Sequence, residues 1–126
     1  MWNYEFYRDD EGNEPVKDFL LTLDKKARAK VMAFMQILSE YGPTLHYPYS
    51  SQVEGKIREL RPRFGKTAYR IMYYQDRNRV FILLHGFIKK TGKTPKNEID
   101  IARLRMKDGD QRKKRKKGGD FSAKKN

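Results

Sequence analysis

The segment IRELRPRFGKTAYRIMYY, residues 57–74, has the alternation of apolar and polar residues that is typical of two β-strands joined by a turn. Many of its other residues are charged, namely Arg58, Glu59, Arg61, Arg63, Lys66 and Arg70. A pair of strands does not need this density of charge to fold. The segment therefore predicts a sheet, and it also indicates that the sheet carries a site for an anion.

The positive charge of the chain is concentrated in its second half. Residues 1–54 contain 6 Lys/Arg and 9 Asp/Glu, residues 55–106 contain 14 and 4, and residues 107–126 contain 9 and 3. Positive charge that is segregated in this way favours a polyanionic partner. RNA, DNA and an anionic membrane surface all satisfy that description, so charge by itself does not choose among them.

The composition excludes several kinds of site and segment. The chain has 126 residues and Cys 0, which fits one domain without disulfides or thiolate metal ligands. Its N-terminus lacks the basic and apolar regions of a signal peptide. The longest apolar run, VFILLHGFI, is too short to span a bilayer. We therefore expect a cytoplasmic protein with no membrane partner.

Two helices are expected in the N-terminal third, after a short strand at residues 2–7. Pro15 suits the first position of a helix whose apolar residues follow with i, i+3, i+4, i+7 spacing. Asp24 suits the N-cap of a second helix, which is expected to end near Tyr41. Residues 43–55 are rich in Pro, Ser and Tyr and are expected to form a loop.

Three strands and a last helix are expected in the basic half. The strands cover roughly residues 56–61, 67–75 and 79–86. The helix is expected to end near Met106, and residues 107–126 to form a basic, disordered tail outside a domain of residues 1–106. The predicted fold class is α+β: a small antiparallel sheet with an N-terminal helical hairpin on one face and a short C-terminal helix. The other face is expected to be partly open.

Strand alternation places basic side chains on that open face. If Leu60 and Ile71 point into the core, Glu59, Arg61 and Arg70 share the opposite face. Arginine binds phosphate oxygens in bidentate pairs, and aromatic rings stack on unpaired bases. The further candidates for RNA binding are Lys56, Arg58, Arg63, Lys66, Tyr74 and Phe87. For each of these residues by itself, a solvated surface or a place in the core is the simpler explanation.

The remaining chemistry is acid–base catalysis without a metal. The two histidines and the scattered carboxylates predict neither a metal site nor a cofactor. RNA supplies its own nucleophile, the 2′-OH, so an enzyme needs a base, cations for the phosphate and an acid for the leaving 5′-oxygen. Glu59 is the candidate base, although a cross-strand ion pair explains it equally well. The acid stays open among His85, Tyr73 and Lys89.

The segments KIREL, AYRIMYY and LLHGFIKKTGKTP, in this order before a last helix, resemble the HigB/RelE class of type II toxins. The phage-derived HigB-like toxins are the nearest branch, and the resemblance covers about residues 1–106. It implies an mRNA interferase that cuts mRNA on the ribosome by 2′-OH attack without a metal. It also implies that a HigA-like helix-turn-helix antitoxin neutralises the protein, and that operator DNA is contacted only through this antitoxin.

The resemblance also implies roles for individual residues. Arg70 corresponds to the arginine that binds the phosphate and the transition state. Lys89 and Lys90 correspond to the basic pair after the last strand, and Glu59 and Arg61 lie in the groove. The last helix lacks the Tyr or His that some relatives use as the acid. Two alternatives remain: a toxin on this scaffold that inhibits gyrase without cutting RNA, and a non-catalytic RNA- or DNA-binding protein.

Overall fold

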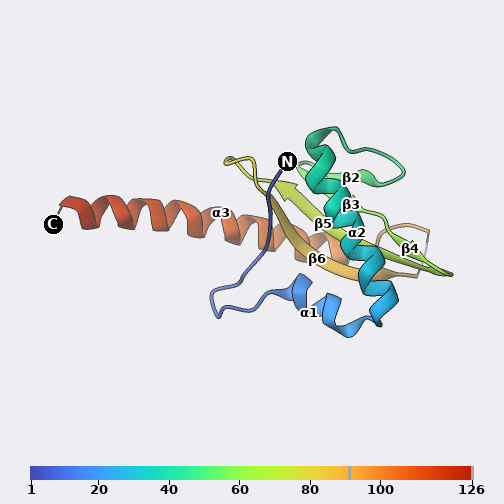
Figure 1. The fold of residues 1–126 in the computed structure, drawn as a ribbon. Coiled ribbons are helices and arrows are strands. Elements are labelled where there is room, and N and C mark those ends of the chain that lie inside the picture. The colour runs from blue at the N-terminus through green and yellow to red at the C-terminus, as the bar shows by residue number, and fades with distance from the viewer. Residues whose placement is uncertain (91, 126) are drawn as a thin grey trace.

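The computed structural model describes residues 1–90 and 92–125, with side chains through residue 114. Its elements, in chain order, are β1 (Tyr4–Phe6), α1 (Pro15–Thr22), α2 (Lys25–Tyr41), the 3-10 helix η1 (Gly42–Thr44), β2 (Ser50–Glu54), β3 (Ile57–Leu60), β4 (Arg63–Phe64), β5 (Thr67–Gln75), β6 (Phe81–Lys89) and α3 (Lys96–Lys125) (Figure 1). None of the helices in these ranges is apolar over a length that could cross a bilayer. The predicted α+β class is confirmed.

The first two helices begin and end at residues with a local physical cause. Pro15 opens α1, where its missing N–H costs no hydrogen bond. Asp24 caps α2, since its carboxylate accepts a hydrogen bond of 2.9 Å from the N–H of Ala27. Gly42 follows the last turn of α2 with a φ of 59°, and a Cβ there would lie 2.3 Å from the indole of Trp2. Both predicted helices are confirmed.

The sheet is mixed, so the expectation of a purely antiparallel sheet is wrong. Its strand order is β1-β6-β5-β3-β2, with β4 paired to β5. The β3–β5 and β5–β6 pairs are antiparallel, whereas β1 runs parallel to β6. No hairpin joins β1 to its neighbour in the sheet, because α1, α2 and the other strands lie between them in the chain. A tight hairpin would make β1 antiparallel to its neighbour, but this long connection allows β1 to run parallel to β6.

Two strands differ from the prediction: β2 was not expected, and β6 is longer than expected. β2 lies inside the expected loop at residues 43–55 and pairs antiparallel with β3. Its sequence, SSQVE, has one apolar residue, so the period-2 signal of a strand is absent. β6 continues past the predicted end at residue 86 and carries Lys89 into the sheet beside Ala68 of β5.

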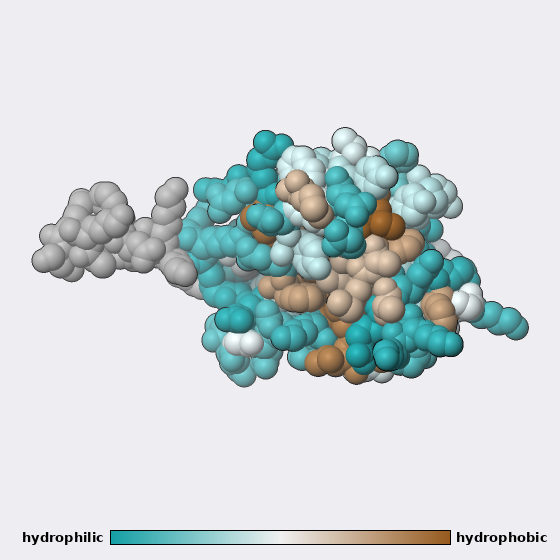
Figure 2. All heavy atoms as spheres, in the orientation of Figure 1, coloured by the Kyte–Doolittle hydropathy of each residue, from teal (hydrophilic) through white to brown (hydrophobic). Residues whose placement is uncertain are grey.

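Helices cover both faces of the sheet. On one face, α1 and α2 pack over a core that includes Leu60, Ile71 and Leu83. On the other face, α3 packs through Ala102 over a core that includes Met72. In Figure 1, α2 crosses in front of the strands and the first part of α3 lies behind them. Figure 2 views the α2 face, where apolar side chains form a band with hydrophilic ones on either side.

The last helix is longer than predicted. α3 runs from Lys96 to Lys125, so the expected helix end near Met106 is wrong. Three polar contacts hold the added turns against the rest of the domain: Tyr7 with Asp108, Tyr74 with Asp110, and Asp76 with Lys113. Residues 107–114 are therefore packed helix rather than the start of a disordered tail. From Arg115 onward, the side chains of the expected tail lie outside the described residues.

Candidate nucleic-acid interface

The register of β3 and β5 decides which side chains share a face. Leu60 pairs with Ile71, and both belong to the core under α2. Their chain neighbours Glu59 and Arg70 therefore point to the opposite face, because successive residues of a strand alternate. This is the juxtaposition that the sequence predicts. β4 then folds back beside β5 and places Arg63 opposite Ala68.

A hollow of about 440 Å³ opens at this end of the sheet. Its lining residues come from three strands and the segments next to them, and they are Arg61, Arg63, Lys66, Ala68, Arg70, Lys89, Lys90 and Gly92. We call it the basic hollow, since every charged residue of this lining is a Lys or Arg. Lysine and arginine are the side chains that bind phosphate groups, and a groove of one sign concentrates counter-ions.

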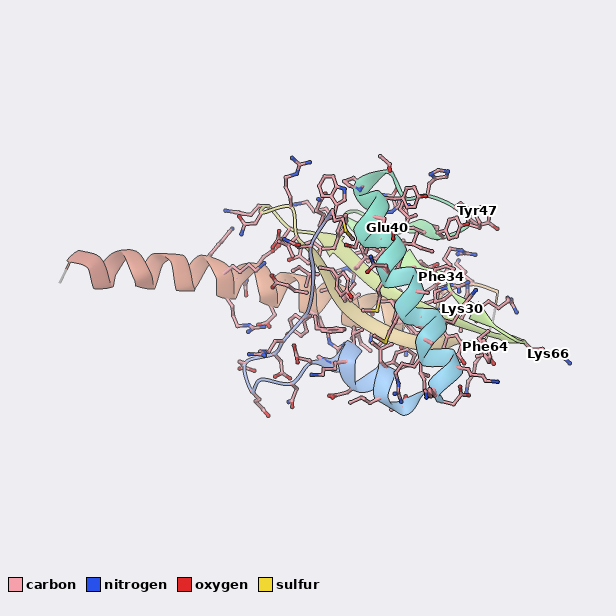
Figure 3. All side chains as sticks on the ribbon, viewed as in Figure 1. Lys30, Phe34, Glu40, Tyr47, Phe64 and Lys66 are labelled. Atoms are coloured by element: carbon pink, nitrogen blue, oxygen red, sulfur yellow. The ribbon has the colours of Figure 1, made fainter. Side chains whose placement is uncertain are left out.

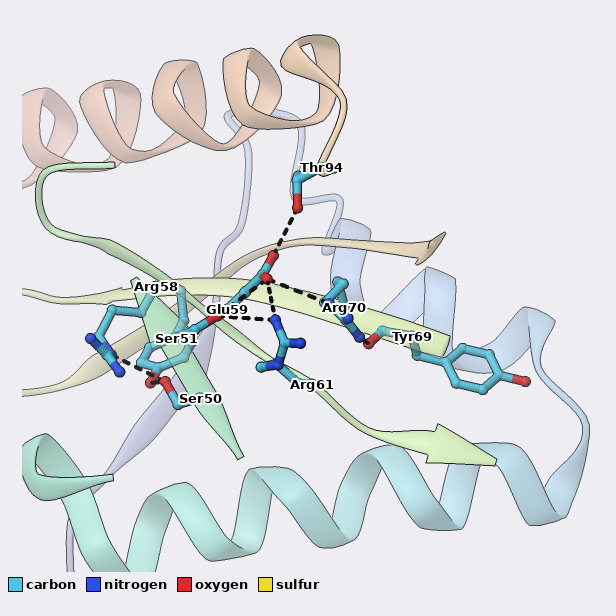
Figure 4. Close-up of polar contacts among 9 residues, drawn as sticks. Ser50, Ser51, Arg58, Glu59, Arg61, Tyr69, Arg70 and Thr94 are labelled. Carbon is cyan, nitrogen blue, oxygen red and sulfur yellow. Dashed lines mark hydrogen bonds and ion pairs between the residues drawn. The ribbon is translucent and has the colours of Figure 1, made fainter. Parts of the chain in front are cut away.

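Glu59 lies at the back of the basic hollow and is only 4% exposed. Its Oε2 is 3.1 Å from Nη1 of Arg61 and 3.4 Å from Nε of Arg70. The hydroxyls of Ser51 and Thr94 donate to Oε2 and Oε1, each at 3.4 Å (Figure 4). A general base must reach the proton that it abstracts. In this structure the Glu59 carboxylate instead faces two guanidinium groups, and it fixes their positions.

Arg70 is a buried cation with only partial compensation. It is 6% exposed, its Nη1 donates to the Tyr69 carbonyl at 2.8 Å, and its Nε faces Glu59 without the direction of a hydrogen bond. Burial and the charge of Arg61 lower the pKa of Arg70, against the pull of Glu59. Burial and the charge of Arg70 also lower the pKa of Lys89. These cations repel one another, so an anion bound among them would relieve that repulsion.

His85 is turned away from the basic hollow. Its Nδ1 accepts a hydrogen bond from Nη1 of Arg105, so its Nε2–H donates to Oε1 of Glu98, both at 3.2 Å. Its ring also stacks on Phe87, with centroids 5.5 Å apart. Burial lowers the pKa of His85 and outweighs the contact with Glu98, which raises it, and the charge of Arg105 adds a smaller lowering effect. Both ring nitrogens are thus engaged with α3, and the sequence prediction of His85 as an acid loses its geometric support.

Several other predicted residues also lie outside the hollow. Phe87 is 7% exposed and Tyr74 is 2% exposed in the cluster that packs against α3, so neither ring is open to solvent for the base stacking that the sequence predicts. Tyr73 is buried on the α2 face with its hydroxyl 2.6 Å from Ser50. Lys56 and Arg58 line a separate depression. For Arg58 the cause is the alternation of side chains along β3, because Arg58 precedes Glu59 and points to the other face of the sheet.

Sequence reasoning missed three residues that contact the arginines and Glu59. Ser51 lies on the strand that was expected to be loop, and Thr94 suggests a helix cap because Pro95 follows it. Tyr47 places its ring 5.1 Å from Cζ of Arg61 in a cation–π contact. Their positions depend on how separate segments fold together, so no local pattern indicates them. Elsewhere among the described side chains, no three His, Asp or Glu gather as a metal-binding group.

Comparison with known proteins gives a family match over the part of the chain that forms this site. No curated protein matches the chain. Residues 18–107 match the family described as Phage derived protein Gp49-like (DUF891), and this range contains every residue that lines the basic hollow. That family lies within the RelE/HigB-type superfamily, whose members are the toxins of toxin–antitoxin systems. The chain therefore belongs to the Gp49-like family of toxin–antitoxin toxins.

Proposed function

We propose that the protein is an mRNA interferase, a toxin that cleaves mRNA in the basic hollow without a metal ion. The observation that carries the proposal is the lining of the hollow, in which the described charged side chains are all cationic and come from β4, β5, β6 and the segments beside them. Membership of a toxin family supports the same reading. A rigid set of cations on strands is suited to hold one phosphodiester and to stabilise the charge that develops on it.

In the proposed reaction the 2′-oxygen of one nucleotide attacks the adjacent phosphorus, and the bond from phosphorus to the 5′-oxygen breaks. The products are a 2′,3′-cyclic phosphate and a 5′-hydroxyl. Arg61 and Arg70 bind the non-bridging oxygens, whose negative charge grows in the transition state. Lys66 and Lys90, both exposed at the rim of the hollow, bind the flanking phosphates.

Glu59 acts as a positioning residue in this mechanism. It contacts Arg61 and Arg70 directly and is closed off from solvent, so it holds their guanidinium groups toward the hollow. Because the described lining holds no carboxylate or imidazole, the proton of the 2′-OH passes to water in the open hollow. The role of base that the sequence predicts for Glu59 is therefore not part of this proposal.

Lys89 is the proposed donor of the proton to the leaving 5′-oxygen. Of the three acids that the sequence leaves open, it is the one whose side chain lines the hollow. Burial and the charge of Arg70 lower its pKa, which makes the ammonium a stronger acid. The Lys89→Arg variant keeps the charge but cannot give up its proton near neutral pH. We expect this variant to bind RNA like the wild type and to cleave it at least 100-fold more slowly.

The proposal includes the partners that the family resemblance implies. A helix-turn-helix antitoxin of the HigA-like type neutralises the toxin, and operator DNA is bound through that antitoxin. The ribosome presents the mRNA to the basic hollow. The resemblance to the HigB branch and the toxin family membership support these assignments.

The deciding experiment is primer extension on an mRNA translated in a cell extract, with and without the purified protein. Arg70→Ala is the test variant, and Arg77→Ala, an exposed arginine in the turn between β5 and β6, is the charge-matched control. We expect new 5′ ends in register with the reading frame for the wild type and the control, and their loss in Arg70→Ala. The same RNA without ribosomes tests whether the ribosome is required.

A second function is favoured by one observation about the residues suited to acid–base work: Glu59 is buried, His85 is partly buried, and both are paired. A non-catalytic protein that only holds RNA or DNA would have such a site. It would bind RNA with a strong salt dependence and leave mRNA intact, and Arg70→Ala would weaken binding only modestly. Intact mRNA together with inhibited DNA supercoiling would instead identify a gyrase inhibitor.

A further inference from the structure

A second hollow, of about 490 Å³, lies next to the basic one and differs from it in chemistry. It is formed by the end of α2 and the loop that leads to β2, and three tyrosines line it: Tyr41, Tyr47 and Tyr49. We call it the tyrosine hollow. These tyrosines are 58%, 66% and 44% exposed, which is unusual for large aromatic side chains. An exposed aromatic cluster indicates a binding surface.

The two hollows meet at Arg61 and Tyr47. Arg61 lines the basic hollow and Tyr47 lines the tyrosine hollow. The guanidinium Cζ of Arg61 lies 5.1 Å from the centre of the Tyr47 ring, so a ligand bound by Arg61 is in immediate reach of that ring. Figure 3 shows Tyr47 at the same end of the molecule as Phe64 and Lys66, which belong to the β4 turn beside the basic hollow.

The two hollows differ in charge and therefore favour different ligand groups. The described lining of the tyrosine hollow has no Lys or Arg and contains one carboxylate, Glu40. A phosphate is therefore disfavoured there and favoured among the cations next door. An uncharged, flat, partly polar group is favoured, because it can stack on tyrosine rings. An unpaired nucleobase has these properties, and in RNA it is covalently joined to the phosphate that the basic hollow attracts.

Side chains of α2 support one wall of the tyrosine hollow. The ring of Phe34 on α2 lies 5.7 Å from that of Tyr49, and Nζ of Lys30 lies 5.8 Å from the centre of the Phe34 ring. These contacts restrain Tyr49 before any ligand binds. A ring that is already held in place loses less conformational entropy on binding.

We propose that the tyrosine hollow is a nucleobase subsite, in which the base of a nucleotide flanking the bound phosphate stacks on Tyr47. The inference rests on the proposed function, since the RNA is placed by its phosphate in the basic hollow. It adds a contact to the base, which would make the protein sensitive to bases as well as to charge. Stacking of one base on an aromatic side chain contributes about 5- to 150-fold in affinity, that is roughly 1–3 kcal/mol.

The test separates stacking from charge by using two probes with the same number of phosphates. One is an octamer of 2′-O-methyladenosine, which has no free 2′-OH and cannot be cleaved, and the other is an abasic octamer of the same backbone. Fluorescence anisotropy gives the Kd of each, and the ratio of abasic Kd to adenosine Kd measures the contribution of the bases. We expect a ratio of about 5 or more for the wild type.

In Tyr47→Ala we expect this ratio to fall toward 1 while the abasic Kd stays unchanged. Tyr47→Phe keeps the ring and should keep the ratio. Leu104→Ala removes a side chain of similar exposure, 68%, from α3 and serves as the control. Since Tyr47 is 66% exposed, its truncation should leave the melting temperature unchanged, which circular dichroism verifies.

Two outcomes would overturn the inference, namely a wild-type ratio near 1 and a ratio that Tyr47→Ala does not change. If that variant weakens the binding of both probes by the same factor, the ratio stays the same and Tyr47 acts only through Arg61. Primer extension tests the proposed function separately. Cleavage of mRNA with a ratio near 1 would refute the subsite and leave the interferase standing, whereas a Tyr47-dependent ratio without cleavage would refute the interferase and keep the subsite.

Discussion

The buried contact between Glu59 and Arg70 makes a strong prediction about stability. The side chains of Glu59 and Arg70 are 5% and 8% exposed, so Glu59→Gln leaves a buried cation without its counter-charge. Removing one partner of a buried ion pair costs about 3–5 kcal/mol. Arg61, the second partner of Glu59, is 23% exposed and keeps its hydration, so we expect the lower end, about 3 kcal/mol.

The exposed pair between Glu54 and Arg103 provides a matched control. Its atoms are 2.6 Å apart, closer than those of the buried pair, but its side chains are 49% and 45% exposed. Solvent screens such a pair, so Glu54→Gln should cost at most about 1 kcal/mol. Thermal unfolding followed by circular dichroism at pH 7 measures both. For a chain of this length, about 3 kcal/mol corresponds to a decrease in Tm of roughly 10–15 °C.

The same variant should bind inorganic phosphate more tightly than the wild type, because Arg61 and Arg70 no longer share their charge with an internal carboxylate. Added phosphate should therefore raise the Tm of Glu59→Gln by more than it raises that of the wild type. A decrease in Tm no larger than that of Glu54→Gln would refute the reasoning on burial. An equal phosphate effect in both proteins would show that Glu59 does not compete for the arginines.

Three further predictions concern the packing of the sheet and its helices. Gly86→Ala should cost about 1–3 kcal/mol, because a Cβ at that position would lie 2.5 Å from Phe19, and Phe19→Leu should restore part of the loss. The pKa of His85 is lowered in the folded protein, so the unfolded chain binds the proton more readily and wild-type stability falls as pH decreases below about 6.5. In His85→Gln, the free energy of unfolding should depend less on pH in that range. Truncation before Lys107 should cost roughly 2–4 kcal/mol through three lost polar contacts, whereas truncation after Lys114 should retain them.

Urea unfolding measures all three, each with its own control. Gly92→Ala has no neighbour within 4 Å of the added Cβ and should be neutral, so an equal cost at both glycines would contradict the packing argument. His46→Gln, which replaces the other histidine at an exposed position, is the control for His85→Gln. An unchanged profile in His85→Gln would show that His85 is not the titrating group. Equal stability of the two truncated chains would show that residues 107–114 do not hold α3 in place.

The elements of this fold that have an apolar period could be predicted from the sequence. The spacing in α1 and α2 and the alternation in β3 and β5 each repeat within a few residues, so a linear reading detects them. Alternation also placed Glu59 and Arg70 on one face, which is the basis of the candidate site. The same parity places Arg58 on the opposite face, because it precedes Glu59 in the strand, although Arg58 is also among the residues predicted to bind RNA.

The tertiary structure decided everything that depends on contacts between distant segments. The turns of α3 beyond Met106 have no apolar stripe, and polar contacts such as that between Tyr74 and Asp110, 36 residues apart, hold them in place. The burial of Tyr74 and Phe87 and the partial burial of His85 depend on how α3 packs on the sheet.

The sequence by itself determined the two N-terminal helices, the strands of the basic half and the arginines that share a sheet face with Glu59. Only the tertiary structure decided that Glu59 is sealed behind these arginines and that Tyr47 lies beside Arg61. The physical reason is how far apart in the sequence the interacting residues lie. Periodicity records how each element faces the core, whereas desolvation and long-range hydrogen bonds depend on which elements are covered once the chain has folded.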